Sequence, residues 1–203
     1  MKTFIASPHL GDKWKKIQGE FVQLYTTDYT LFQYDVPGCS HLKSLKTCVK
    51  FLVDSGSSGD LLVIMDSDAF PIAEWQERVL TYLEEGNEFV AIQRLENPYW
   101  WKEIAHPSFC AWKYGTDIFF DGASTPYIYG YLTRKWKKLH RTNVNNLHEI
   151  MYGIYDNFIY HHGAGSRGDI EKEAYFSPGL KWKDDIFNDP MKFISTLRGR
   201  NDS

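Results

Sequence analysis

Two aspartates separated by one residue, Asp66 and Asp68, are the residues best suited by type and spacing to chemistry. They directly follow residues 61–65, an apolar run without polar alternation that predicts a strand covered on both faces. Because ligands of open α/β sheets bind outside the carboxyl ends of the strands, both carboxylates are expected at the active edge. Their oxygens suit Mg²⁺ or Mn²⁺, which keep positions open for water and substrate phosphates. The alternative is that both aspartates only cap a helix beginning near Pro71.

A second segment with useful chemistry, residues 161–167, directly follows the last predicted strand. A histidine nitrogen there can complete a metal site that carboxylates begin. Gly165 and Ser166 are small enough for backbone N–H groups to approach phosphate oxygens, and the Arg167 guanidinium offers a bidentate contact. The segment therefore predicts a diphosphate-binding turn, with a plain glycine-rich turn and a packed histidine as the alternative.

The elements that must position these residues alternate between short apolar runs and longer stretches of helical periodicity. This alternation predicts an α/β fold with a Rossmann-like, mainly parallel central sheet and helices on both faces. A length of 203 residues favours one domain, 1–203. In the first half we predict strands at 3–7, 30–34, 61–65 and 89–93, with helices at 12–25, 42–52 and 71–86.

The second half is less regular in its periodicity. We predict a strand that runs through Trp112 and a further strand at 157–160. Helices are predicted at 127–139 and, more briefly, at 147–155, followed by a helix near the carboxyl terminus.

Composition and charge exclude several classes of protein. The net charge of −3 and the isoelectric point near 6.2 lack the basic character that nucleic-acid binding requires. No apolar run approaches the roughly 18 residues of a membrane helix. The three cysteines show no CxxC spacing, which fits a reducing compartment. We therefore expect a cytoplasmic protein that uses neither nucleic acid nor a transmembrane segment.

The buried strand with its Asp-X-Asp ending, LLVIMDSDAFP at 61–71, and the late strand with its histidine-glycine turn resemble the GT-A glycosyltransferases. With the opening ASPHLGD at 6–12 and the overall length, the chain looks most like the small glycosyltransferase domain of large algal viruses. The resemblance implies a GT-A type fold with a nucleotide-sugar half at about 1–95 and an acceptor half at about 96–203. It also implies transfer of a hexose or deoxyhexose from a nucleoside diphosphate sugar, with UDP expected, to a glycan hydroxyl.

The resemblance also implies roles for the residues of the metal site. Asp68 would bind Mn²⁺ or Mg²⁺, and Asp66 would bind the ribose or would reach the metal through water. His162 or His161 would bind the metal from the other side.

Residues near the ends of the first two strands correspond to those that hold the nucleotide in this family. Ser7 and His9 stand at the end of the first predicted strand, and Asp35 follows the second. Asp35 is equally well explained as a turn residue before Pro37.

The general base is the part of the family pattern that the sequence lacks. No Glu-Asp pair stands at the start of a later helix, where many inverting members carry this base. Asp117, Asp121 and Glu149 are the candidates to deprotonate an acceptor hydroxyl, and their spacing does not choose among them.

Two other functions remain open on sequence grounds. A strand ending in Asp-X-Asp also begins the haloacid-dehalogenase phosphatases. The later lysine and acidic pair of that family would correspond to Lys181 or Lys183 and to Asp184 and Asp185. The motif here follows the third predicted strand instead of the first, which weighs against a phosphatase. The other alternative is a non-catalytic sugar-binding domain, suggested by the unassigned base.

Overall fold

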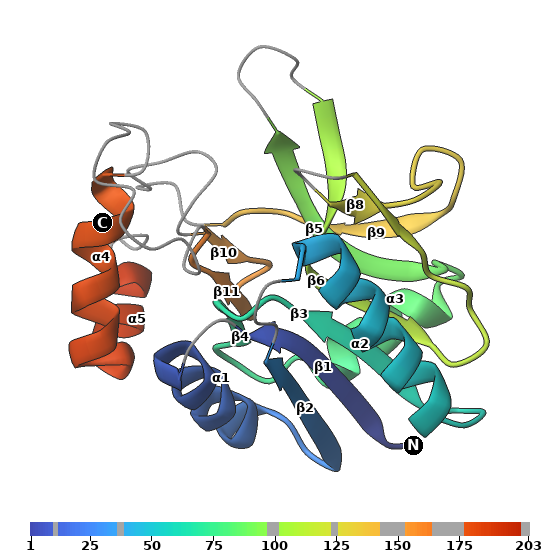
Figure 1. Cartoon of the computed structure of the whole chain (residues 1–203), viewed down its shortest axis with the longest axis horizontal. Helices are drawn as coiled ribbons and strands as arrows, with labels where there is room; N and C mark the ends of the chain where they lie inside the picture. The colour runs from blue at the N-terminus through green and yellow to red at the C-terminus, as the bar shows by residue number, and fades with distance from the viewer. Residues whose placement is uncertain are drawn as a thin grey trace.

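The computed structural model describes residues 1–9, 12–35, 39–96, 102–122, 126–142, 153–163 and 177–199. Its centre is a six-stranded sheet with the order β2-β1-β3-β6-β5-β9 (Figure 1). Only β6 runs against its neighbours, because β1 is parallel to β2 and β3, and β5 is parallel to β9. The strands are β1 Thr3–His9, β2 Tyr29–Asp35, β3 Leu61–Met65, β5 Phe89–Glu96, β6 Lys102–Lys113 and β9 Trp136–Leu139. The α/β class and the mainly parallel sheet predicted from the sequence are confirmed.

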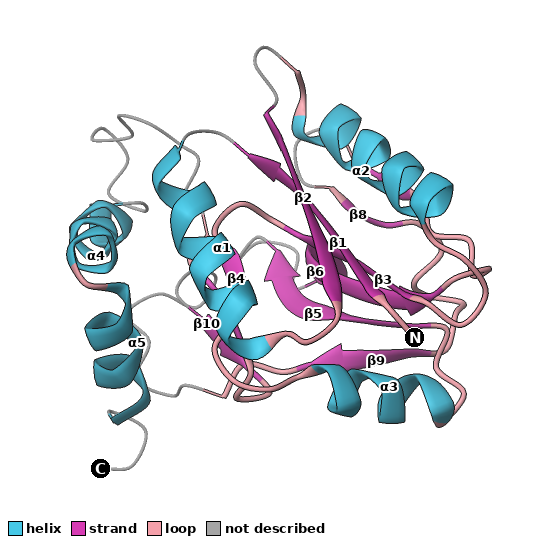
Figure 2. Cartoon of the chain, turned by 90° about the horizontal axis from the view of Figure 1, so that it is seen from below, coloured by secondary structure: helices cyan, strands magenta, loops and turns pink. Residues whose placement is uncertain are grey.

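Helices cover both faces of this sheet, as predicted (Figure 2). The helices are α1 Asp12–Tyr25, α2 His41–Ser55 and α3 Gln76–Glu84. Alternate residues of β3 belong to different cores: Leu62 packs with α2, whereas Val63 packs with α1 and α3. Since successive side chains of a strand point to opposite faces, a strand between two helical layers is apolar throughout. This explains the unbroken apolar run before the aspartates.

A small second sheet joins the Asp-X-Asp segment to the late part of the chain. It has the order β10-β11-β4, with strands β4 Ala69–Pro71, β10 Gly153–Tyr155 and β11 Ile159–His161. Antiparallel pairing of β11 with β4 sets His161 opposite Ala69. Helices α4 Ser177–Asn188 and α5 Pro190–Gly199 lie beside this sheet and share a third core with α1 (Figure 1). The late histidines are thereby brought next to the aspartates.

Strand β6 pairs in two registers with β5. Ala91 lies opposite Cys110, but the next residue, Ile92, lies opposite His106. Three residues of β6, 107–109, therefore have no counterpart on β5, which makes this a β-bulge. On its other side the same segment pairs with β3, where Phe109 lies opposite Met65.

Several predicted elements are wrong. The helix predicted at 127–139 is two strands, β8 Tyr127–Ile128 and β9, separated by a turn with Gly130 in the left-handed region. Strand β8 pairs with β7 Phe120–Asp121, and β9 pairs with β5, where Trp136 stacks on Phe89. These tertiary contacts override the helical periodicity. Residues 153–155 of the helix predicted at 147–155 form β10 instead, and residues 147–152 lie outside the described residues.

The helix predicted to begin near Pro71 begins instead at Gln76, because Ala69–Pro71 forms β4. Trp75 occupies its N-cap position. The alternative in which Asp66 and Asp68 cap this helix is therefore wrong. Among the described residues, no helix has both the length and the apolar character needed to span a bilayer.

Candidate metal centre

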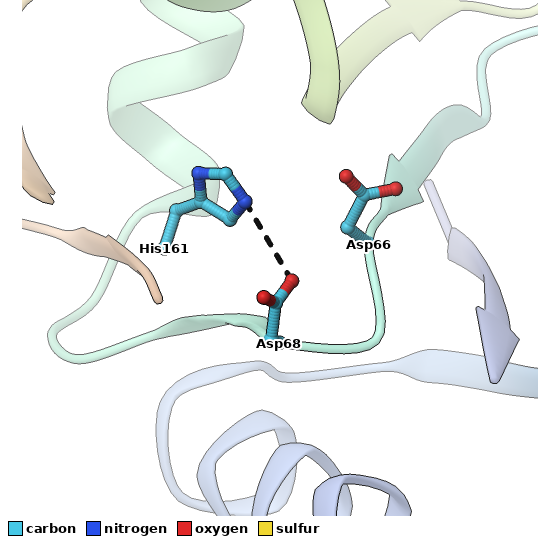
Figure 3. Close-up of side chains that lie close together, drawn as sticks. All are labelled: Asp66, Asp68 and His161. Atoms are coloured by element: carbon cyan, nitrogen blue, oxygen red, sulfur yellow. Dashed lines mark ion pairs between the residues drawn. The ribbon is translucent and has the colours of Figure 1, made fainter. Parts of the chain in front are cut away.

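Asp66, Asp68 and His161 form a buried cluster at the carboxyl end of β3 (Figure 3). One potential ligand atom from each residue lies within 4.8 Å of the others. The Nε2 atom of His161 is 3.6 Å from Oδ1 of Asp68. Asp66, Asp68 and His161 are 8%, 4% and 2% exposed, so bulk water hardly reaches these groups. Two segments far apart in the sequence, one with Asp66 and Asp68 and the other with His161, thus offer two carboxylates and one imidazole to the same small volume.

The backbone that carries the two aspartates is held by neighbouring strands. The Asp66 N–H donates to the carbonyl of Ser108 on β6 at 3.0 Å, and the His162 N–H donates to the carbonyl of Asp68 at 3.0 Å. Within the turn, the Ala69 N–H donates to the carbonyl of Asp66 at 3.0 Å. Such fixation holds the carboxylates in place before a ligand arrives, which reduces the reorganisation needed for binding.

His41, the first residue of α2, lies against one of the aspartates. Its Nε2 is 2.9 Å from Oδ1 of Asp66. Burial by itself would raise the pKa of the Asp66 carboxyl, but the charge and the hydrogen bond of His41 outweigh it and hold this pKa below the usual range. Asp66 therefore stays ionised and able to bind a cation.

His106 on β6 is a further buried imidazole next to the cluster. Its ring centroid is 5.8 Å from that of His161, and the Arg94 guanidinium donates to its Nε2 at 3.0 Å. Burial, followed by the charge of Arg94, holds the pKa of His106 well below 6.5. Since Arg94 can only donate, Nε2 of His106 carries a lone pair, which agrees with a neutral ring.

The cluster fits a divalent cation by its chemistry and its size. Mg²⁺ and Mn²⁺ favour oxygen ligands, and an imidazole nitrogen is acceptable to Mn²⁺. An octahedral ion about 2.1 Å from its ligands separates opposite ligand atoms by about 4.2 Å, so the observed spread closes after small side-chain rotations. Burial also lowers the pKa of His161, which favours the neutral form that binds metals. The residues present therefore fit a divalent cation.

The buried histidines predict how stability depends on pH. Burial lowers the pKa values of His9, His106 and His161, so between the folded and unfolded pKa values the unfolded chain binds more protons. With a chelator present, the free energy of unfolding should therefore fall as the pH drops below about 6.5. Each histidine contributes a loss of about 1.4 kcal/mol for every unit by which folding lowers its pKa. Urea unfolding at pH 7.5 and pH 5 measures this loss.

His106→Gln should reduce that pH dependence, because one buried imidazole no longer titrates. His140→Gln is the matched control, since His140 is exposed. Equal pH dependence in His106→Gln and the wild type would contradict this assignment.

The residues predicted to hold the nucleotide lie at the ends of the first two strands. Ser7 and His9 belong to β1 itself, which continues to His9 because that residue pairs with Asp35 on β2. Both side chains are buried, and within the described part of the chain Oγ of Ser7 and Nδ1 of His9 have no hydrogen-bond partner. Asp35 is exposed, with Nζ of Lys15 at 3.3 Å from its carboxylate. Their nucleotide contacts stay predictions.

The structure brings His161, and not His162, to the two aspartates. Neighbouring residues of an extended chain point to opposite sides. The Nδ1 atom of His162 is 2.9 Å from the hydroxyl of Tyr160, and its ring centroid is 4.9 Å from that of Trp14. His162 thus packs in the third core, and of the two histidines left open by the sequence His161 is the better placed ligand.

Three candidate bases were predicted, and neither of the two that the structure describes is linked to the cluster. Asp117 is exposed. Asp121 is exposed on β7, where its carboxylate accepts from the Gly122 N–H at 2.7 Å and from the Tyr127 hydroxyl at 3.3 Å. Glu149, together with Gly165, Ser166 and Arg167 of the predicted diphosphate-binding turn, lies outside the described residues. The base and the turn stay predictions.

Sequence reasoning missed His41, His106, Arg94 and Gln18. His41 could have been found, because it follows Ser40, the N-cap of a helix that begins near the active edge. Both His106 and Gln18 lie in stretches that are otherwise typical of a strand or a helix. Only the tertiary structure shows that they face the site.

Comparison with known proteins gives distant likenesses only. No protein family matches the chain, and no curated protein does. The crystal structure of A197 from STIV covers 89% of this chain and 78% of its own, at 13% identity and a TM-score of 0.38. A glycosyltransferase involved in the glycosylation of the major capsid of PBCV-1 matches at 12% identity and a TM-score of 0.38. That match spans 56% of this chain and 60%, less than two thirds, of the glycosyltransferase.

Proposed function

We propose that this chain is a glycosyltransferase that moves a hexose or deoxyhexose from a nucleoside diphosphate sugar, with UDP as the expected nucleotide, to a hydroxyl of a glycan. The observation that carries the proposal is the buried cluster of Asp66, Asp68 and His161 at the carboxyl end of β3. Ligands of open α/β sheets bind at this edge, and a cation held there can bind a diphosphate.

The described residues would contribute to the reaction by binding and by excluding water. Asp66, Asp68 and His161 would hold Mg²⁺ or Mn²⁺, whose Lewis acidity would offset the charge that develops on the departing diphosphate. Ser7 and His9, which present buried polar atoms near the end of β1, are the proposed contacts for the nucleotide. Because the cluster is buried, its charges act in a medium that screens them less than water does.

No observation favours the phosphatase alternative. Its later acidic pair would correspond to Asp184 and Asp185, which are exposed on α4 and not buried with Asp66. The test below also distinguishes a glycosyltransferase from a non-catalytic sugar-binding domain.

Calorimetric titration of UDP and several UDP-sugars, with and without Mn²⁺, tests the proposal. We expect binding that requires the metal, together with release of UDP when a glycan acceptor is added. Hydrolysis of an aryl phosphate without nucleotide-sugar binding would instead support a phosphatase. Binding of glycan alone, without metal and with the nucleotide sugar left intact, would identify a sugar-binding domain.

A further inference from the structure

Gln18 is a completely buried residue of α1 whose side-chain amide uses its full hydrogen-bonding capacity. Its Nε2 donates to the carbonyls of Asp66 and Ala69, each at 2.8 Å. Its Oε1 lies 2.8 Å from Nε2 of His9 and accepts from Nε2 of Gln33 at 3.2 Å. One side chain thus joins the turn that carries the aspartates to the ends of β1 and β2.

The two donated bonds fix both ends of the turn 66–69. The carbonyl of Asp66 already accepts from the Ala69 N–H, so Gln18 occupies its second lone pair. The carbonyl of Ala69 is bound to the same Nε2 atom. Since Asp68 lies between these two carbonyls, its backbone cannot shift relative to that of Asp66 without breaking a buried hydrogen bond.

The accepted bond acts on His9. An amide oxygen can only accept, so Nε2 of His9 must carry the proton in this pair. Burial lowers the pKa of His9, which favours a neutral ring, and its Nδ1 is then a bare acceptor. That atom is buried and has no hydrogen-bond partner among the described residues.

We propose that Gln18 is a positioning residue that sets the geometry of the metal-binding turn and, through the same amide, the tautomer of His9. The part of this inference that concerns metal binding rests on the proposed function, whereas the part that concerns the His9 tautomer does not. It predicts that the two properties are lost together when the amide is removed.

Gln76, which is half-buried, offers a control with the same number of amide hydrogen bonds at the opposite end of the sheet. Its amide also makes four hydrogen bonds, with its Oε1 accepting from the N–H and hydroxyl of Thr27 and its Nε2 donating to Thr3 and to the Thr27 carbonyl. Loss of this amide removes as many bonds as loss of Gln18 but touches neither the turn nor His9. A glutamine that only stabilises the fold should behave like Gln76.

The test compares Gln18→Met and Gln76→Met, which remove the amide without adding charge. We expect Gln18→Met to weaken Mn²⁺ binding about 10- to 100-fold, the usual effect of losing a group that orients a ligand. The tautomer of His9 is read from ¹⁵N NMR of the imidazole nitrogens. It should be Nε2–H in the wild type and in Gln76→Met, and mixed in Gln18→Met. Mn²⁺ affinity and tautomer equal to the wild type in Gln18→Met would overturn the proposal.

Gln18→Glu provides a second variant should Gln18→Met not fold. It keeps an acceptor for His9 but supplies at most one donor, so at least one of the two carbonyls of the turn loses its partner. We expect an unchanged His9 tautomer with a displaced backbone amide signal of Ala69, and an unmoved signal would count against the role of Gln18. If the wild type binds no Mn²⁺, the proposed function fails, while the His9 tautomer still decides the inference on Gln18.

Discussion

Asp68→Asn should abolish metal-dependent binding of the donor and lower kcat/KM by about 1000-fold or more. The variant keeps the size of the side chain but removes the charge that would attract a divalent cation. Stabilisation of a departing diphosphate by a cation contributes several kcal/mol, and each 1.4 kcal/mol corresponds to about tenfold in rate. The carbonyl of Asp68, which accepts from the His162 N–H, is unchanged, so the fold should be preserved. Calorimetry with Mn²⁺ and UDP, together with steady-state kinetics, measures both effects.

Asp60→Asn is the control for this variant, because Asp60 precedes β3 as Asp66 follows it. Its carboxylate accepts from the N–H of Lys2 at 2.9 Å and from the N–H and hydroxyl of Ser57 at 3.0 and 2.9 Å. Its replacement should lower the free energy of unfolding by about 1–3 kcal/mol and leave Mn²⁺ binding unchanged. Donor affinity in Asp68→Asn equal to that of the wild type would rule out the proposed metal site.

His161→Ala should mainly weaken metal binding and His162→Ala should mainly lower stability, although the two residues are adjacent. Loss of a residue that only orients a metal ligand weakens binding about 10- to 100-fold, so loss of the direct ligand His161 should weaken Mn²⁺ binding about 100-fold or more. His162→Ala removes the contact with the Tyr160 hydroxyl and the packing against Trp14. Its main effect should be a loss of about 1–3 kcal/mol in the free energy of unfolding.

Mn²⁺ titration and urea unfolding of both variants separate these effects. A larger loss of Mn²⁺ affinity in His162→Ala, in a protein that is still folded, would show that the ligand is His162, the other histidine that the family resemblance allows.

The sequence predicted the part of the site that lies on regular, strongly patterned structure. The apolar run of β3 is covered on both faces, so it differs from an alternating strand, and the pattern alone locates its carboxyl end. The aspartates at that end were therefore recognisable. His161 was recognisable as one of two neighbours, but the choice between them depends on the pairing of β11 with β4, a strand that the sequence pattern does not predict.

The rest could not be predicted because it depends on contacts between distant segments. A helical period fits residues 127–139, yet parallel pairing with β5 and the stacking of Trp136 on Phe89 make part of that segment a strand. Gln18 lies on the buried side of an amphipathic helix, where the pattern predicts only an apolar residue. Its polarity is explained by carbonyls that lie 48 and 51 residues away in the sequence.

The bulge in β6 determines where the fold tolerates insertions and deletions. Beyond the bulge, residues 93–96 of β5 pair, among the described strands, only with residues 102–105 of β6, so their length can change without altering the pairing of β6 with β3. Deletion of one residue between His106 and Cys110 is different. Because side chains alternate along a strand, it would turn the His106 imidazole to the opposite face and separate it from His161. Natural insertions and deletions should therefore occur near the end of β5 and the start of β6, and not in the bulge.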